Sequence, residues 1–99
     1  MERTGLDEWE LNLIRGVLAR HKEITGAVLF GSRAKGTALP ASDVDLAIDG
    51  IDDPLQAEAI ASELDELPLP YHFDVKARAT IQSRPLQEHI ERVGVRVFR

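Results

Sequence analysis

Two aspartates alternate near the middle of the chain, in the segment Asp43-Val44-Asp45. On an extended strand, residues two apart are separated by about 6–7 Å and point to the same face. Carboxylates converging from that spacing can bridge two divalent cations about 3.5–4 Å apart, the separation used in two-metal phosphoryl transfer. Hard oxygen ligands suit Mg²⁺, which takes one or two carboxylates together with substrate phosphates. Asp43 and Asp45 are therefore predicted to be metal ligands and catalytic residues.

A glycine-serine pair stands twelve positions before these aspartates, directly after a short apolar run. Gly31 lets a phosphate approach the backbone closely, Ser32 adds a hydroxyl, and N–H groups at the start of the following turn favour an anion. Arg33 and Lys35 could offset the charge of a triphosphate, although plain surface charge is the alternative for both. These four residues are predicted to bind the nucleotide.

Asp74 is the best candidate for a third carboxylate. It lies on the polar side of an alternating segment, and His72 on the same side is the second candidate for a proton-handling role. If this segment lies beside Asp43 and Asp45, Asp74 can reach the same metals or accept the acceptor's proton. Two carboxylates about 5 Å apart repel each other by roughly 3 kcal/mol at an effective dielectric near 20, so cations are needed before a triphosphate can bind.

The elements that must position these residues are predicted from hydrophobic periodicity. The first is a helix over 5–21 with a capping box at Thr4 and Asp7. Its buried stripe is expected to contain Leu6, Trp9, Leu13 and Val17, together with Ile14 and Leu18. A buried strand over 25–30, a helical turn over 33–36, a loop over 37–42 and a strand over 43–49 follow.

The second half alternates helices and strands. Asp53-Pro54 is a good helix start, and the buried side of that helix is expected to be Leu55, Ala59, Ile60, Leu64 and Leu67. A strand over 71–75, a helix starting at 83–85 and stopping at Gly94, and an edge strand over 95–98 complete the chain. The fold class is therefore α/β (α+β), a small mixed sheet of about four strands with flanking helices.

Composition narrows the class of protein. The 99 residues are expected to form one domain, and the absence of cysteine excludes disulfides, zinc–thiolate sites and a cysteine nucleophile. A net charge of −5 disfavours direct binding of nucleic acid, which depends on cationic contacts to phosphates. No apolar run is long enough to cross a membrane and no signal peptide is visible, so we expect a cytoplasmic protein.

The motif resembles that of the minimal nucleotidyltransferases, the MNT group of the DNA polymerase β superfamily. That pattern is a Gly-Ser turn, a basic stretch, a Gly, then Ser-Asp-x-Asp-Leu, and a later Asp on a strand. Here it reads Gly31-Ser32-Arg33-Ala34-Lys35-Gly36, then Ser42-Asp43-Val44-Asp45-Leu46, then Asp74. The resemblance covers nearly the whole chain and implies the polymerase β-like nucleotidyltransferase fold over residues 1–99.

The resemblance also implies an activity and a partner. MNT proteins of this size are often antitoxins encoded beside a HEPN-domain toxin, and they resemble enzymes that use Mg²⁺, two ions being expected, to attach AMP from ATP to a tyrosine of that toxin. Two alternatives stay open. The chain could mask a toxin by direct binding without catalysis, or modify a small molecule as a dimer. Whether it forms a homo-oligomer or a hetero-oligomer is left open as well.

Overall fold

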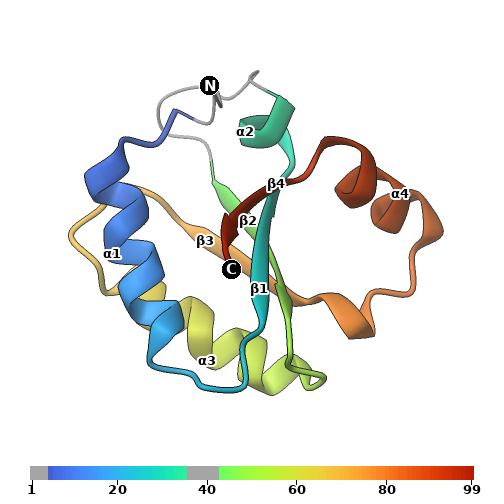
Figure 1. Ribbon diagram of the computed structural model, residues 1–99, viewed down its shortest axis with the longest axis horizontal. Coiled ribbons are helices and arrows are strands. Elements are labelled where there is room, and N and C mark those ends of the chain that lie inside the picture. The colour runs from blue at the N-terminus through green and yellow to red at the C-terminus, as the bar shows by residue number, and fades with distance from the viewer. Residues whose placement is uncertain (1–4, 36–42) are drawn as a thin grey trace.

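A four-stranded sheet forms the centre of the protein. The computed structural model describes residues 5–35 and 43–99. Strands β1 (Gly26–Phe30), β2 (Val44–Asp49), β3 (Phe73–Ala77) and β4 (Val95–Phe98) lie in the order β3-β2-β1-β4 (Figure 1). β1 pairs antiparallel with β2 and β4, whereas β2 and β3 are parallel. The expected small mixed sheet of about four strands is therefore confirmed, and so is the edge position of the last strand.

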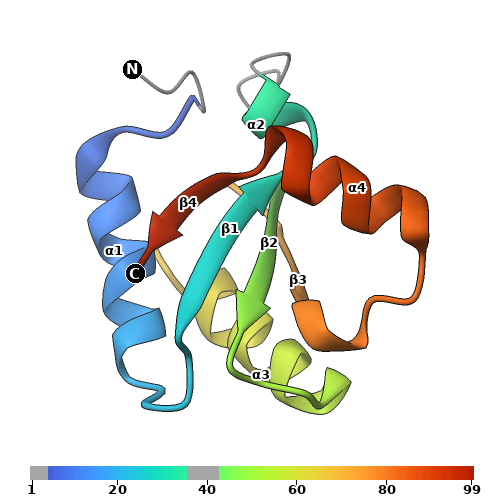
Figure 2. The ribbon, with the colours of Figure 1, turned by 45° about the vertical axis from the view of Figure 1, so that its right-hand side comes forward.

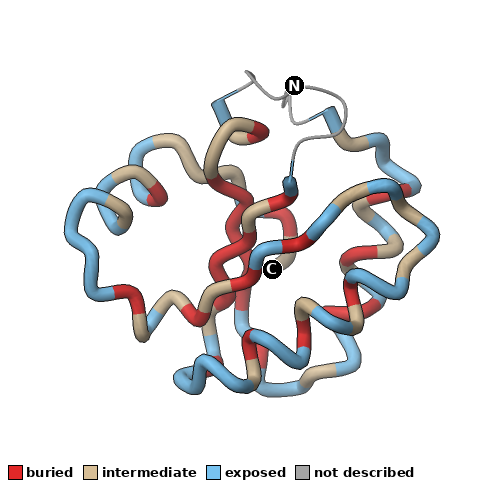
Figure 3. The backbone as a smooth tube through the Cα atoms, turned by 180° about the vertical axis from the view of Figure 1, so that it is seen from behind, coloured by how far each residue is buried: buried red, intermediate tan, exposed pale blue. Residues whose placement is uncertain are grey.

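Helices cover both faces of this sheet. Helices α1 (Glu8–Ala19) and α3 (Pro54–Asp65) pack on one face, and α4 (Arg84–Val93) packs on the other (Figures 1 and 2). The larger core lies under α1 and α3 and contains the odd-numbered side of β3 and the even-numbered side of β2. A smaller cluster of Val28, Phe30, Ala47, Ile81 and Ile90 lies under α4. Buried backbone accordingly runs through the middle of the molecule (Figure 3).

Helix α1 is shorter than predicted and is rotated about its axis. It begins after Asp7, whose backbone N–H donates to the Glu10 carboxylate at 2.8 Å in a capping box. The predicted capping residue Thr4 lies outside the described residues. Trp9 is 57% exposed and Glu10 is buried, so the expected burial of Trp9 was wrong. The inward position goes to Glu10 because its carboxylate also accepts a hydrogen bond from the Tyr71 hydroxyl at 2.9 Å.

Helix α3 starts where expected but buries a different stripe. The Asp53 side chain caps it by accepting from the Leu55 N–H at 2.9 Å. Leu55 itself is 70% exposed and Ala59 is exposed, so both predictions of burial were wrong. The buried residues are Ala57, Ile60 and Leu64. Their spacing of three and four residues forms one continuous stripe on the helix, and Leu55 and Ala59 lie outside this stripe.

The remaining elements confirm the predicted order with shifted ends. The strand expected over 71–75 is β3 at Phe73–Ala77, and it continues into a short 3₁₀ helix, η1 (Arg78–Thr80), which was not predicted. The helical turn expected over 33–36 is helix α2 (Ser32–Lys35), which begins one residue earlier, and α4 stops at Gly94 as predicted. The predicted loop over 37–42 falls outside the described residues. In the part of the chain that is described, no helix is long and apolar enough to cross a membrane.

Candidate functional site

Asp45 and Asp74 are neighbours on adjacent strands. The parallel register pairs Asp45 of β2 with Asp74 of β3, and paired residues of neighbouring strands point to the same face. Adjacent strands lie about 4.8 Å apart, which brings the two carboxylates into electrostatic contact. The structure thus meets the condition on which the choice of Asp74 depends, that its strand lies beside that of Asp45. Asp43 stands one residue before β2, is exposed, and lies two positions from Asp45 along the same alternation.

The charges in this cluster are only partly offset. Burial of the Asp45 carboxyl, followed by the negative charges of Asp74 and Asp43, raises the pKa of Asp45 above its ordinary value of 3.8, while Lys76 acts in the opposite direction. Lys76 lies 3.9 Å from the Asp74 carboxylate, and both side chains are partly exposed. The three aspartates therefore make a patch of negative charge that a cation would relieve.

The opposite end of the same sheet face is electrically different. Asp49 of β2 lies 3.7 Å from Arg78 and 3.9 Å from Arg96, so its carboxylate has cationic partners. Asp45 and Asp49 share a face of one strand, but the acidic neighbours Asp74 and Asp43 and the Gly31 turn lie at the Asp45 end. The negative charge that a cation could offset is therefore concentrated at the Asp45 end of this face.

Gly31 places the turn after β1 directly beside Asp45. The last residue of β1, Phe30, pairs with Asp45, and Gly31 follows with φ of +78°, in the left-handed region that favours glycine. A Cβ at Gly31 would meet the Asp45 carboxylate. The glycine is required twice over, for the backbone conformation and for the close approach to the carboxylate. The turn after β1 thus meets β2 at the end that carries Asp45.

His89 is a residue that the sequence reasoning missed. Its Nε2 accepts a hydrogen bond from the Gly31 N–H at 3.1 Å, and its ring packs edge-on against Phe30 with centroids 6.3 Å apart. An accepting Nε2 carries no proton, so the neutral ring has its proton on Nδ1. Position 89 lies three residues after Leu86 and four before Val93, a helical spacing that puts the three residues on one side of α4. That spacing was the available signal that His89 faces the sheet.

Arg33 is placed in the interior. Its side chain is 1% exposed and its guanidinium lies over the Tyr71 ring, 4.5 Å from the centroid. Burial, then the hydrogen bond to Glu10 and its charge, raises the pKa of Tyr71, while Arg33 lowers it, so the phenol stays a neutral donor. This placement favours a structural role in which Arg33 anchors α2 to the strand region. A contact between Arg33 and the nucleotide stays a prediction.

The other predicted residues are distributed around the turn. Ser32 begins α2 and is half-buried, and Lys35 ends it with an exposed side chain. His72 is mostly exposed, and its Nδ1 lies 3.7 Å from the Asp65 carboxylate. This neighbour draws His72 toward the end of α3, which favours Asp74 over His72 for proton handling.

The donor set fits Mg²⁺ by its chemistry. Over residues 5–35 and 43–99, no three acidic or histidine side chains are gathered into a ready metal-binding cluster. Asp43, Asp45 and Asp74 nevertheless offer hard carboxylate oxygens, and burial together with repulsion from Asp74 and Asp43 raises the pKa of Asp45. Mg²⁺ keeps several waters and takes ligands from substrate phosphates, so it needs only one or two protein carboxylates in place.

Comparison with solved structures shows what this fold is similar to. A chain in the complex of a tri-AMPylated Shewanella oneidensis HEPN toxin with an MNT antitoxin matches with a TM-score of 0.72 and 20% identity, over 93% of this chain and 71% of that one. A toxin–antitoxin structure with AMP-PNP matches with a TM-score of 0.73 and 22% identity, over 93% of this chain and 73% of that one. A mutant of the MntA–HpeT toxin–antitoxin matches with a TM-score of 0.73 and 26% identity, over 92% of this chain and 71% of that one. The comparison with curated proteins found no match.

The family comparison covers most of the chain. Residues 12–99 match the model described as Polymerase beta, Nucleotidyltransferase. This range contains the Gly31 turn, Asp43 just before β2, Asp45 of β2 and Asp74 of β3, and the structure places Gly31, Asp45 and Asp74 at one end of one sheet face. The matched range, the mixed sheet and the acidic cluster beside the glycine turn agree with one another. The chain belongs to the polymerase beta nucleotidyltransferase family and is a nucleotidyltransferase.

Proposed function

We propose that this chain transfers AMP from ATP, with Mg²⁺, onto a tyrosine hydroxyl of a HEPN-domain toxin. The observation that carries the proposal is the pairing of Phe30 with Asp45 and of Asp45 with Asp74, which sets the Gly31 turn beside paired carboxylates. The similar structures include a tri-AMPylated HEPN toxin with its MNT antitoxin and a toxin–antitoxin with AMP-PNP. The choice of a HEPN toxin as acceptor and of ATP as nucleotide in this proposal is based on these two similar structures.

The reaction is an in-line displacement at the α-phosphorus of ATP. The acceptor oxygen forms a bond to that phosphorus, the bond to the bridging oxygen breaks, and pyrophosphate leaves with the electron pair. Asp43, Asp45 and Asp74 would hold the divalent cations, which when bound neutralise the carboxylates and the triphosphate. The turn at Gly31 and Ser32, with exposed Lys35, holds the β and γ phosphates.

The acceptor hydroxyl must lose its proton as it attacks. Asp74 is the carboxylate proposed to accept it, because Asp74 stands at the outer strand of the sheet and its side chain is 49% exposed, so an incoming acceptor can reach it. Asp45 is more enclosed, with Gly31 beside it. Because the proposed reaction consumes ATP, we propose that it takes place in the cytoplasm.

The test is label transfer. The purified chain is incubated with ATP labelled at the α-phosphate, Mg²⁺ and the HEPN protein encoded beside it, and the toxin is analysed by gel and by mass spectrometry. We expect the toxin to gain AMP on tyrosine, and the double variant Asp43→Ala with Asp45→Ala to abolish transfer. Asp52→Asn, an exposed aspartate before α3, is the matched control and should retain activity.

Other outcomes would replace the proposal. If the double variant neutralises the toxin as well as the parent chain does, direct masking explains the neutralisation. If the chain modifies a small alcohol or an aminoglycoside without any protein partner, it is a small-molecule nucleotidyltransferase. The absence of label on the toxin with the parent chain would reject protein adenylylation.

A further inference from the structure

Strand β3 is an edge strand, and its free edge is closed at both ends by side chains. The β2 N–H of Val44 donates to the His72 carbonyl at 2.9 Å, which sets which residues of β3 bond to β2. Along a strand, successive residues direct their N–H and C=O groups to opposite sides, so Asp74 and Lys76 bond to β2. The groups of Phe73, Val75 and Ala77 point outward.

One outward group at each end already has a side-chain partner. The Phe73 N–H donates to the Asp65 carboxylate at 3.1 Å, and the Ala77 carbonyl accepts from the Thr80 hydroxyl at 2.9 Å. Between these two caps, the outward N–H and C=O of Val75 have no hydrogen bond to any group in the described ranges. Val75 lines a cavity at this edge, and an outward backbone N–H and C=O on an edge strand are available to pair with another strand.

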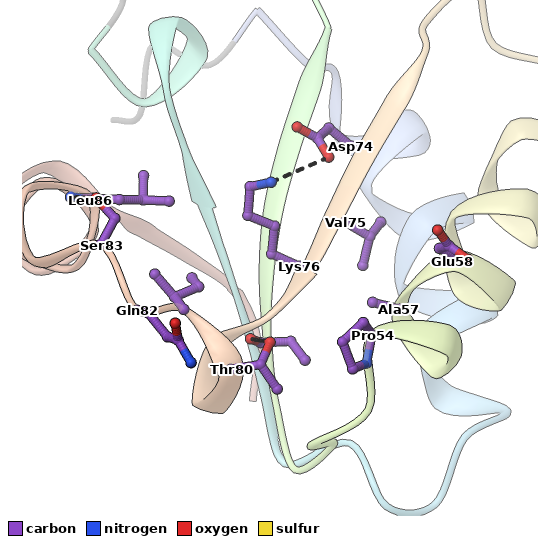
Figure 4. A pocket seen from close by; sticks show the side chains of 12 residues that line it. Pro54, Ala57, Glu58, Asp74, Val75, Lys76, Thr80, Gln82, Ser83 and Leu86 are labelled. Carbon is purple, nitrogen blue, oxygen red and sulfur yellow. Dashed lines mark hydrogen bonds and ion pairs between the residues drawn. The ribbon is translucent and has the colours of Figure 1, made fainter.

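A cavity of about 450 Å³ lies along this open stretch. One wall is the start of α3 with Pro54, Ala57 and Glu58, and the other is η1 with the start of α4, including Ile81 and Leu86. Figure 4 shows Val75 turned toward Ala57, with the Asp74 and Lys76 side chains on the other side of the strand. The cavity thus borders the backbone groups of Val75 and the catalytic face at Asp74 together.

We propose that the acceptor protein docks here as a short extended segment, adding a strand to the β3 edge and so presenting its hydroxyl to Asp74. This inference rests on the proposed function and names how its protein substrate is held. Strand addition supplies partners for the Val75 N–H and C=O, and the Asp65 and Thr80 caps limit the added strand to about three residues.

The register of the added strand explains which residue is modified. Neighbouring strands put paired side chains on the same face about 5 Å apart. A residue paired with Asp74 therefore projects its side chain to the face that holds Asp45 and Asp74, where the acceptor oxygen is needed. A residue paired with Val75 projects toward Ala57 and Pro54, where a small apolar side chain fits. The acceptor segment is accordingly a hydroxyl residue next to a small apolar one.

One test blocks the cavity from a helix position. Glu58 is exposed on the α3 wall, so Glu58→Trp fills the cavity without removing a core side chain, and Ala59→Trp, exposed but outside the cavity, is the matched control. With the HEPN protein as acceptor, we expect kcat/KM for AMP transfer to fall at least tenfold for Glu58→Trp. Transfer to N-acetyltyrosinamide, which has no strand to add, should change by less than twofold. Equal loss for both acceptors would overturn the docking proposal.

A second test addresses the backbone groups directly. Val75→Pro removes the outward N–H while leaving the bonds of Asp74 and Lys76 to β2, and Val75→Ala keeps the N–H with a similar loss of side chain. We expect Val75→Pro alone to lose transfer to the HEPN protein. Should Val75→Pro fail to fold, hydrogen exchange of the parent chain decides, because binding of the HEPN protein without ATP should slow exchange of the Val75 amide.

The outcomes separate this inference from the proposed function. No AMP on the HEPN protein with the parent chain rejects the proposed function. Transfer by the parent chain that Glu58→Trp leaves unchanged, with Val75 exchange unaltered by the partner, rejects only docking at the β3 edge. Protection of Val75 that grows with the concentration of this chain alone would assign the edge to a second copy and overturn the proposal.

Discussion

Replacing Asp45 by asparagine should stabilise the protein in the absence of metal. The substitution keeps the shape of the side chain and removes a charge that Asp74 and Asp43 repel. At the roughly 5 Å spacing of paired strands, two like charges repel by about 1–3 kcal/mol for dielectrics between 80 and 20. Because the Asp74 side chain is 49% exposed and Lys76 offsets part of the charge, the lower limit applies. A gain of about 1 kcal/mol corresponds to a rise in Tm of about 4–8 °C.

The gain should depend on pH in a defined direction. The pKa of Asp45 is raised in the folded state, so the folded protein holds this proton more tightly than the unfolded chain. The parent chain therefore has the full benefit of a protonated Asp45 below about pH 3.8 and loses it as the pH rises through the raised pKa. The Tm difference between Asp45→Asn and the parent should be present at pH 7 and disappear toward pH 3.8.

The assay is thermal unfolding followed by circular dichroism in EDTA, with and without added Mg²⁺. Mg²⁺ at ten times its Kd should stabilise the parent by about 1.4 kcal/mol, and it should stabilise Asp45→Asn less. Asp52→Asn removes the same charge from an exposed position and is the control for net charge. If Asp45→Asn melts at or below the parent at pH 7 without metal, or if Asp52→Asn gains as much, the acidic cluster is not strained and the reasoning fails.

Three further substitutions test the surroundings of the site. Gly31→Ala forces a side chain into the left-handed region against the Asp45 carboxylate. We expect the free energy of unfolding in urea to fall by about 1–2 kcal/mol and the rate of AMP transfer to fall at least tenfold. Unchanged activity would contradict the close approach of Gly31 to Asp45. His89→Ala leaves the Gly31 N–H without its acceptor and should raise the KM for ATP. His89→Gln can still accept this hydrogen bond, so its KM should return toward the parent value. Equal kinetics for the two variants would exclude a role of the His89–Gly31 hydrogen bond in ATP binding. Tyr71→Phe deprives buried Glu10 of a hydrogen-bond donor and should lower the free energy of unfolding in urea by about 1–2 kcal/mol. The rate of AMP transfer should stay within twofold of the parent. A large loss of activity at full stability would instead assign Tyr71 to the chemistry.

The local pattern of the chain was sufficient for the elements that carry the chemistry. Alternation over 43–49 predicted a strand with its carboxylates on one face, and β2 at Val44–Asp49 has that arrangement. The Gly31 turn after a buried run was predictable because a glycine with positive φ needs no distant partner to be recognised. These features depend on residues within a few positions of one another, and backbone geometry converts such spacing directly into shared faces.

Burial on the helices was less predictable. Trp9 and Leu55 have the apolar character of core residues but are exposed, whereas Glu10 and Arg33 are charged and buried. The two charged residues meet at Tyr71, which accepts the Arg33 guanidinium over its ring and donates its hydroxyl to Glu10. Periodicity ranks positions by side-chain type, so it cannot anticipate a buried charge whose partner lies far along the chain.

The sequence by itself determined the nature of the site, a pair of alternating carboxylates after a glycine-serine turn, because residue type and spacing alone specify those donors. Only the tertiary structure decided that Asp74 lies beside Asp45, that His89 holds the Gly31 N–H, and that the Val75 edge is left open between two caps. Each of these depends on segments that are distant in sequence and meet only when the sheet assembles, because strand order and helix docking are set by burial of the whole core.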